Sequence, residues 1–234
     1  MEHLVVLTGA GMSAESGIAT FRDENGLWRN FNPMELASVS GFRRNREAAL
    51  EFYNARRAQL ATVEPNHGHK VLAALEKNYR VDIITQNVDY LHERAGSTSV
   101  LHLHGQLALV TGINNPNDPR CIRPKPLTEP IGMDEKAADG SRLRPYVVFF
   151  GEPVPNIRRA TELVESADIF VVIGTSLLVT PAADLLQVPH WNAARYVIDP
   201  GDVPSAVNLG YKHIRAGASA GLDTLAEILL ATGD

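Results

Sequence analysis

Polar side chains that could move a proton follow two apolar runs of the sequence. Gln86, Asn87 and Asp89 come after one run, and His104 follows another at residues 100–103. An imidazole has an unperturbed pKa of about 6.5, so it can accept a proton near neutral pH. Because ligands of α/β proteins gather at strand ends, we expect these side chains to share one crevice.

A second histidine, His102, lies two residues before His104. In a regular strand the two side chains would point to the same face. Gly105 follows His104, and we expect His104 to be the base and His102 to be a hydrogen-bonded structural histidine. A structural role for His104 remains the alternative at this stage.

A glycine-rich turn follows the first apolar run, at residues 4–8. Residues 9–14, Gly-Ala-Gly-Met-Ser-Ala, fit the dinucleotide-binding pattern with alanine in its last place. The glycines allow a tight turn and close approach to a pyrophosphate, and a following helix would add its positive end. A dehydrogenase would also need an acidic ribose ligand roughly 20 positions on, at a second strand. Residues 26–30 offer no such strand, so we expect a purpose other than hydride transfer; a purely structural turn is the alternative.

The elements that must position these residues alternate along the chain. Apolar runs predict strands at residues 4–8, 81–85, 100–103, 147–150, 169–173 and 196–198. Helical patterns occur at residues 68–77, 157–166, 181–186 and 222–230. This alternation predicts an α/β fold, with a Rossmann-like parallel sheet covered by helices on both faces.

Two stretches break the alternation. Residues 23–61 read as helical without a strand, and residues 106–144 are rich in Pro, Asn, Asp and Gly. We therefore expect one catalytic domain, residues 1–234, that contains a Rossmann-like core and a small inserted module. The expected core comprises about residues 1–22, 62–105 and 145–234, and the expected module about residues 23–61 and 106–144.

The composition indicates a globular protein with a sizeable buried core. Of 234 residues 44% are hydrophobic and 21% charged, and the formal net charge is -5. That balance gives no general attraction to nucleic acid or anionic membranes. Cys121 is the single cysteine, which excludes a disulfide within the chain. No run is long enough to span a bilayer and no signal peptide is evident, so we expect a cytoplasmic protein. We also expect it to be a monomer, although no sequence pattern determines the oligomeric state.

Several motifs, taken together, resemble the sirtuin family. Residues 9–22 resemble its cofactor loop, residues 86–89 its second motif and His104-Gly105 its catalytic histidine motif. Two further family motifs are matched by Phe150-Gly151-Glu152 and Gly174-Thr175-Ser176. The motifs occur in the family's order and cover nearly the whole chain. The stretch at residues 52–57 resembles the bacterial branch that removes acidic acyl groups.

The resemblance implies an NAD-dependent protein-lysine deacylase. Such an enzyme transfers an acyl group from lysine to the ADP-ribose of NAD, which yields nicotinamide, O-acyl-ADP-ribose and free lysine. NAD is then a consumed co-substrate, and acylated lysine side chains of proteins are the partners. An NAD glycohydrolase or mono-ADP-ribosyltransferase is one alternative, and an NAD-sensing module without turnover is another. The complete polar set around His104 argues against the sensing module.

The resemblance also assigns roles to individual residues. His104 and Asn87 are catalytic, with Asn87 contacting ribose and orienting a water, while Asp89 binds the nicotinamide amide and Gln86 bears on the ribose. Phe21 would cover the reacting sugar, and Arg22 would act near phosphate or as an internal clamp. Asp199 stands where the family more often has Asn, and Ala218 matches a late adenine contact. The expected NAD-binding residues are Gly9, Ala10, Gly11, Ser13, Ala14, Gly17, Phe21, Arg22, Gln86, Asn87, Asp89, Gly174, Thr175, Ser176, Asp199 and Ala218.

Tyr53 and Arg56 are the expected acyl-specificity residues. They are three positions apart, so on a helix they share a face. A guanidinium can grip a carboxylate with two parallel hydrogen bonds, and a phenol can add a third, which suits succinyl- or malonyl-lysine better than acetyl-lysine. A plain glycohydrolase has no use for such a grip. The alternative is a solvated helix surface, since Arg57 also lies there.

Residues near position 150 are expected to bind the substrate peptide. By the resemblance, this edge pairs with an extended peptide by strand addition. The residues concerned are Val147, Val148, Phe150, Gly151 and Glu152. A buried core strand is an equally good interpretation of the individual side chains.

The zinc module of most sirtuins is not expected in this chain. Residues 106–144 hold only Cys121 in place of two cysteine pairs. A structural zinc site needs four ligands, usually sulfur or imidazole, and Asp118, Asp134, Glu135 and Asp139 do not replace them. The zinc of the family is structural, so its loss would leave the chemistry in place but puts the shape of the small module in doubt.

Overall fold

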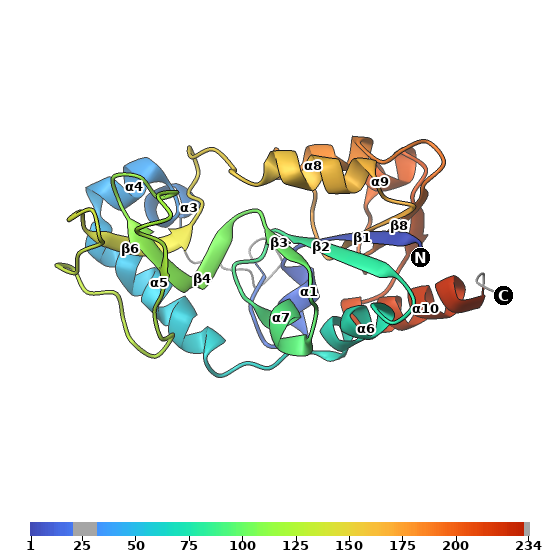
Figure 1. Cartoon of the computed structure of the whole chain (residues 1–234), viewed down its shortest axis with the longest axis horizontal. Coiled ribbons are helices and arrows are strands. Elements are labelled where there is room, and N and C mark those ends of the chain that lie inside the picture. Colours follow the sequence, from blue (N-terminus) through green and yellow to red (C-terminus); the bar gives the residue numbers. More distant parts are fainter. Residues whose placement is uncertain (21–31, 232–234) are drawn as a thin grey trace.

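The computed structural model describes residues 1–20 and 32–231. Six parallel strands form the central sheet in the order β3-β2-β1-β7-β8-β9 (Figure 1). Their bounds are His3–Thr8 for β1, Arg80–Thr85 for β2, Val100–His102 for β3, Ile169–Ile173 for β7, Ala194–Ile198 for β8 and Lys212–Ile214 for β9. All neighbouring pairs are parallel, which confirms the predicted α/β class.

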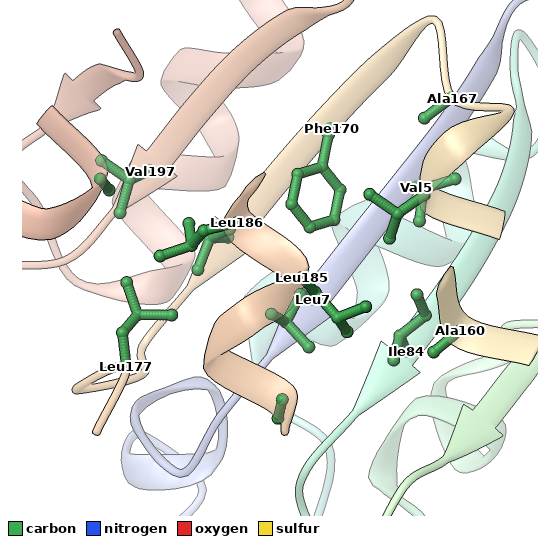
Figure 2. Close-up of a cluster of buried hydrophobic side chains, with 14 of the residues drawn as sticks. Val5, Leu7, Ile84, Ala160, Ala167, Phe170, Leu177, Leu185, Leu186 and Val197 are labelled. Atoms are coloured by element: carbon green, nitrogen blue, oxygen red, sulfur yellow. The ribbon is translucent and has the colours of Figure 1, made fainter. Parts of the chain in front are cut away.

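Helices cover both faces of this sheet because its central strands are apolar on both sides. Val5 and Leu7 of β1 belong to one buried cluster, drawn in Figure 2, and Leu4 and Val6 belong to another. The first cluster packs under α8 (Ile157–Glu165), the 3-10 helix η1 (Ala182–Gln187) and α9 (Pro204–Asn208). The second packs under α6 (His67–Leu75) and α10 (Ala218–Ala231), with α7 (Leu91–Ala95) beside α6. The alternation follows from the two-residue period of a strand.

A small module lies beside the sheet and holds a third buried cluster. It combines α3 (Pro33–Leu36), α4 (Val39–Arg44) and α5 (Arg46–Leu60) with an antiparallel sheet in the order β5-β4-β6. The strands are β4 (Gly105–Gly112), β5 (Arg123–Pro124) and β6 (Leu143–Val147). Strand β4 begins directly after His104, so the module grows out of the carboxyl edge of the central sheet.

Side chains of α5 form hydrogen bonds to the backbone of the loops in this module. Arg57 is fully buried and donates hydrogen bonds to the carbonyls of Leu107, Lys125 (3.0 Å) and Pro126 (2.8 Å). Asn54 pairs with Ile131 in both directions, at 3.1 Å and 2.8 Å. The guanidinium therefore replaces water for carbonyls that would otherwise be buried without a donor. A solvated surface around Arg57, the alternative drawn from the sequence, is wrong.

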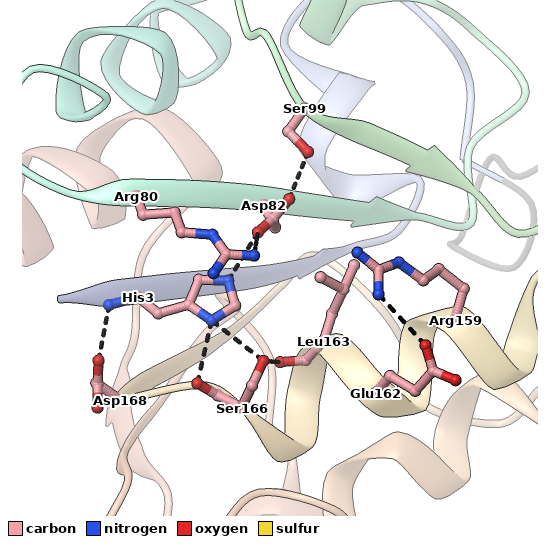
Figure 3. A network of polar contacts seen from close by, with 9 residues as sticks. All are labelled: His3, Arg80, Asp82, Ser99, Arg159, Glu162, Leu163, Ser166 and Asp168. Atoms are coloured by element: carbon pink, nitrogen blue, oxygen red, sulfur yellow. Dashed lines mark hydrogen bonds and ion pairs between the residues drawn. The ribbon is translucent and has the colours of Figure 1, made fainter. Parts of the chain in front are cut away.

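The amino-terminal ends of the strands are joined by a polar network (Figure 3). His3 Nε2 lies 2.7 Å from Asp82 Oδ2, and the Ser99 hydroxyl donates to the same carboxylate. The backbone N–H of His3 donates to Asp168 at 2.8 Å, and its ring Nδ1 lies 3.1 Å from the Ser166 carbonyl. Burial alone would raise the pKa of Asp82, but the hydrogen bonds from Ser99 and His3 bring it below its ordinary value. This network fixes β1, β2 and the end of α8 to one another, away from the carboxyl edge.

The structure differs from the sequence-based expectations about elements in three respects. The strand expected at residues 147–150 is β6, which ends at Val147, because residues 149–152 form a turn. Strands β4, β5 and β9 were missed. The helix expected at residues 181–186 is a 3-10 helix. No helix among the described residues has the length and apolar character to cross a membrane.

Candidate functional site

A cavity of about 920 Å³ lies at the carboxyl edge of the sheet, between the sheet and the small module. Its walls come from the glycine turn after β1, the end of β2, His104, α5, the segment after β6 and the ends of β7 and β8. Gly17 does not line it, and Phe21 and Arg22 lie outside the described residues. The expected site residues on its walls are Gly9, Ala10, Gly11, Ser13, Ala14, Tyr53, Arg56, Gln86, Asn87, Asp89, His104, Val147, Val148, Phe150, Gly151, Glu152, Gly174, Thr175, Ser176, Asp199 and Ala218.

The glycine turn is locked against the end of β7. The Gly11 N–H donates to the Gly174 carbonyl at 2.8 Å. A Cβ on Gly9 would lie 2.6 Å from Thr175 Cβ, and a Cβ on Gly11 would lie 2.7 Å from Gly174 Cα. Gly174 also has a φ of 57°, in the left-handed region that favours glycine. The following helix α1 (Gly11–Ala14) has only four residues, so it adds less dipole than a long helix would.

Asn87 and Asp89 are joined through Ser13. The Asn87 amide nitrogen donates to the Gly9 carbonyl at 3.0 Å and to Ser13 Oγ at 3.1 Å, which fixes the orientation of the amide. The Ser13 hydroxyl in turn donates to Asp89 Oδ2 at 2.9 Å. Burial raises the pKa of Asp89, opposed by hydrogen bonds from the Leu91 N–H and Ser13. The side-chain oxygen of Asn87, Oδ1, is then the amide atom available to a ligand.

The tautomer of His104 follows from its partner. Its Nδ1 lies 2.9 Å from the carbonyl of Gln86, and a carbonyl can only accept a hydrogen bond, so Nδ1 carries the proton. Burial lowers the pKa of His104, and the bond to Gln86 opposes this shift. The ring is therefore neutral at neutral pH, and Nε2 has a lone pair available to accept a proton.

His102 has different surroundings from His104. It is buried, its Nε2 lies 2.7 Å from Glu93 Oε1, and its Nδ1 lies 3.3 Å from the Asn87 carbonyl. It does not line the cavity. Strand β3 ends at His102, so the regular strand that would put both rings on one face does not extend to His104. These contacts match the structural role expected for His102.

Two further buried histidines support the end of β2 from behind. The rings of His69 and His92 meet edge to face at 4.7 Å, and His92 Nε2 lies 3.2 Å from Thr8 Oγ1. The Thr8 hydroxyl donates to Thr85 Oγ1 at 2.9 Å, and that oxygen accepts from the Asn87 N–H at 3.0 Å. Burial lowers the pKa of His69 to about 4 and that of His92 well below its usual value. This support was not expected from the sequence, because no local pattern pairs His69 with His92.

Tyr53 and Arg56 form one end of the cavity. Tyr53 is buried and its ring stacks on Phe149 at 5.6 Å. The Arg56 guanidinium lies 5.0 Å from the Phe52 ring, and its Nε and Nη1 atoms are buried without a hydrogen-bond partner among the described residues. Burial lowers the pKa of Arg56 and raises that of Tyr53, so the phenol stays protonated. A buried donor without a partner is costly, and an anionic ligand would satisfy it.

The segment at residues 147–152 has few backbone groups left for a ligand. The N–H groups of Val148 and Phe150 donate to the carbonyls of His104 (2.9 Å) and Ala37 (2.8 Å). The Glu152 carboxylate accepts from the Phe149 N–H at 2.8 Å and pairs with Arg144. Among the described residues no hydrogen bond is made by the Val148 carbonyl or by the Gly151 backbone. These are the groups that a substrate peptide could use.

Some of the expected NAD-binding residues on the cavity wall are hydrogen-bonded within the protein. The Gln86 side chain donates to Thr175 Oγ1 at 3.0 Å, and Asp199 Oδ1 accepts from the Gly201 N–H at 2.8 Å. Ala218 begins α10. Glu15 was not expected from the sequence but also lines the cavity. It accepts a hydrogen bond from the Ser219 N–H at 3.1 Å, so it links the segment after the glycine turn to α10.

The described residues of the small module offer no donor set for zinc. Cys121 is buried, and among residues 1–20 and 32–231 no group of three or more His, Cys, Asp or Glu side chains could hold a metal ion. Charged side chains within residues 106–144 pair with one another instead, as Lys125 does with Glu135 at 3.0 Å. The residues present do not fit a structural zinc ion.

This fold and cavity define a Rossmann-like α/β domain whose ligand site lies under a small inserted module. Residues 9–181 match the Sir2 family. A curated relative named NAD-dependent protein deacylase, from Bacteroides thetaiotaomicron, is 51% identical over 231 residues, which cover 98% of this chain and 99% of the relative. The chain belongs to the Sir2 family.

Two solved structures show the extent of the similarity. A Sir2 homolog–NAD complex superposes with a TM-score of 0.87 at 39% identity, covering 98% of this chain and 90% of that one. A Sir2 complex with deacetylated p53 peptide and 3′-O-acetyl ADP ribose superposes with a TM-score of 0.78 at 29% identity, covering 96% and 92%.

Proposed function

We propose that this protein is an NAD-dependent protein-lysine deacylase that removes succinyl or malonyl groups as well as acetyl groups. The observation that carries the proposal is that a neutral His104, protonated on Nδ1, shares one cavity with Arg56, whose Nε and Nη1 have no hydrogen-bond partner among the described residues. The first group suits proton abstraction, and the second suits a carboxylate. The names of the relatives support the general activity.

The residues of the cavity fit NAD. Gly9 and Gly11 line the cavity, and because they have no side chains their backbone is exposed to a pyrophosphate, while the turn is held in place by its packing on Gly174 and Thr175. Gly174, Thr175, Ser176, Asp199 and Ala218 would hold the adenosine half, and Ser13, Gln86, Asn87 and Asp89 the nicotinamide ribose half. Bound there, NAD supplies a sugar carbon that loses nicotinamide and accepts the acyl oxygen.

Each polar residue then has a stated task. His104 Nε2 accepts a proton from a ribose hydroxyl, while the Gln86 carbonyl holds the ring in the required tautomer. The side-chain oxygen of Asn87, Oδ1, orients the ribose or a water, because the side-chain nitrogen already donates to Gly9 and Ser13. Asp89, with its raised pKa, binds the nicotinamide amide.

The substrate lysine enters beside the segment at residues 147–152. The Val148 carbonyl accepts the N–H of the acyl-lysine, and the Gly151 backbone pairs with the extended peptide. Arg56 makes two parallel hydrogen bonds to the acyl carboxylate, and the Tyr53 phenol adds a third. A similar Sir2 structure contains a deacetylated p53 peptide, which supports a peptide as the substrate. We further propose that the enzyme acts as a cytoplasmic monomer.

The test is an assay with succinylated, malonylated and acetylated peptides, with and without NAD. Formation of O-acyl-ADP-ribose and free lysine only when NAD and peptide are both present is the expected result. Nicotinamide release without peptide would instead support an NAD glycohydrolase or mono-ADP-ribosyltransferase. No nicotinamide release under any condition would overturn the proposal.

A further inference from the structure

Glu152 lines the cavity, yet both oxygens of its carboxylate are bonded to the protein. Oε1 lies 2.5 Å from Arg144 Nη1, and Oε2 accepts from Arg144 Nη2 at 3.0 Å and from the Phe149 N–H at 2.8 Å. The side chains of Arg144 and Glu152 are 4% and 16% exposed. A bidentate pair fixes the plane of both groups, so the carboxylate is not free to turn toward a ligand.

The same pair closes the turn that follows β6. The Glu152 N–H donates to the Phe149 carbonyl at 2.9 Å, so backbone and side chain of Glu152 both grip Phe149. Gly151, inside this turn, has a φ of 95°, which favours glycine. Arg144 Nη2 also donates to the Val147 carbonyl at 2.5 Å. Both ends of the segment at residues 147–152 are therefore tied to one guanidinium.

Arg144 also reaches the wall of the proposed acyl pocket. Its guanidinium carbon lies 3.6 Å from the centre of the Phe149 ring, in cation–π contact. Tyr53 stacks on the same ring at 5.6 Å with an interplanar angle of 27°, and the Phe42 ring lies 5.1 Å from it. The ion pair thus supports the aromatic wall as well as the peptide-facing backbone.

We propose that Arg144 and Glu152 are a positioning pair for the peptide, and that Glu152 does not bind the peptide itself. The pair holds the segment so that the Val148 carbonyl and the Gly151 backbone remain available to an extended acyl-lysine peptide. This inference rests on the proposed deacylase function, because it assigns the pair a role in that reaction. It also revises the expectation that Glu152 is a direct substrate ligand.

The test is Glu152→Gln, which keeps the side-chain volume and an acceptor for the Phe149 N–H but removes the charge. Steady-state kinetics should show KM for the acylated peptide raised about tenfold or more, in line with the loss of a charge-assisted contact. KM for NAD should stay within about twofold, because the pair does not touch the glycine turn. A lower kcat with both KM values unchanged would mean a merely structural role and would overturn the proposal.

Glu135→Gln is the matched control. Glu135 also accepts from a backbone N–H three residues earlier, that of Gly132 at 2.7 Å, and also pairs with a cation, Lys125 at 3.0 Å. It does not line the cavity. Both KM values should be unchanged in this variant. A rise in peptide KM equal to that of Glu152→Gln would show a general effect of losing an ion pair.

Two peptides that share the acyl-lysine but have basic or uncharged neighbours separate positioning from direct binding. Positioning predicts the same rise in KM for both peptides, whereas a rise confined to the basic peptide would make Glu152 a direct ligand and refute the inference. Arg144→Lys keeps the charge without the bidentate geometry, so it gives the same prediction if Glu152→Gln does not fold. Failure of the wild-type protein to turn over any acylated peptide would overturn the deacylase proposal itself, and this inference with it.

Discussion

Protonation of His104 at Nε2, the nitrogen that acts as the base, determines how activity should depend on pH. Burial lowers the pKa of this ring below 6.5, so the unprotonated base persists as the solution becomes mildly acidic. We expect kcat/KM for deacylation, which reports the free enzyme, to fall on acidification only below pH 6.5. A profile measured between pH 5 and pH 9 checks this. An acid limb centred at or above 6.5 contradicts the assignment, and His104→Tyr should abolish acyl transfer while the fold remains largely intact.

The two guanidinium nitrogens of Arg56 that lack a hydrogen-bond partner in the described part of the chain predict acyl selectivity. Arg56→Met should depress desuccinylation about ten- to a hundredfold more than deacetylation, since charge-assisted hydrogen bonds contribute roughly 1.5–3 kcal/mol. The measurement is the ratio of kcat/KM for matched succinyl and acetyl peptides. Arg56→Lys keeps the charge but loses the two parallel hydrogen bonds, so its ratio should lie between that of the wild type and that of Arg56→Met. Equal losses on both peptides would refute the role given to Arg56.

At the scale of elements, α5 both lines the cavity and holds the small module. Arg57→Met would leave the carbonyls of residues 107, 125 and 126 without their donor. We expect the free energy of unfolding to fall by about 2–4 kcal/mol. Urea unfolding measures this loss, and the reaction rate of the buried Cys121 thiol should rise as the module opens. Arg43→Met, at an exposed position of α4, is the control and should change neither quantity.

The elements that the sequence predicted best are those whose pattern is local. The strands β1, β2 and β7 are short apolar runs, and an apolar run bounded by polar residues is sufficient to indicate a buried parallel strand. Strand β4 mixes Gly, Gln and Thr with apolar residues, and its partner β6 contains Arg144 and Pro145, so neither has a clear period. Their pairing comes from tertiary contacts that no local pattern contains.

The site residues divide in the same way. Motif spacing placed Asn87, Asp89 and His104, and all three line one cavity. Spacing could not show that the Glu152 carboxylate is occupied by Arg144 or that Arg57 is buried, because each fact depends on a partner whose position the fold alone determines. Arg57 and Leu107, for example, are 50 positions apart.

For the molecule as a whole, buried neutral histidines should make stability depend on pH. The folded-state pKa of His69 is about 4 and that of His92 lies well below 6.5, so the unfolded chain binds more protons as the pH falls from about 6.5 toward 4. The free energy of unfolding should drop in this window, by up to about 1.4 kcal/mol per pH unit for each such histidine. Urea unfolding at pH 7, 6 and 5 measures the slope.

His92→Gln removes one titrating group, so the slope of the free energy of unfolding against pH should fall by up to about 1.4 kcal/mol per pH unit. The Gln side chain can still offer Thr8 a hydrogen-bond partner. An unchanged slope in the variant would contradict the proposed origin of the effect. Asp82 acts in a separate window, because its folded-state pKa lies below 3.8. Its contribution to stability is present above that value and is lost as the pH falls through the lower, folded-state pKa.

The contact between the glycine turn and Gly174 limits how this enzyme could be re-engineered. β1 and β7 are neighbours in the middle of the sheet, so a methyl group on Gly9, Gly11 or Gly174 would have to push two core strands apart. Laboratory evolution toward bulkier dinucleotide analogues should therefore leave these three positions unchanged. Accepted mutations should instead accumulate around Asp199 and Ala218, which line the cavity on the side proposed for the adenosine.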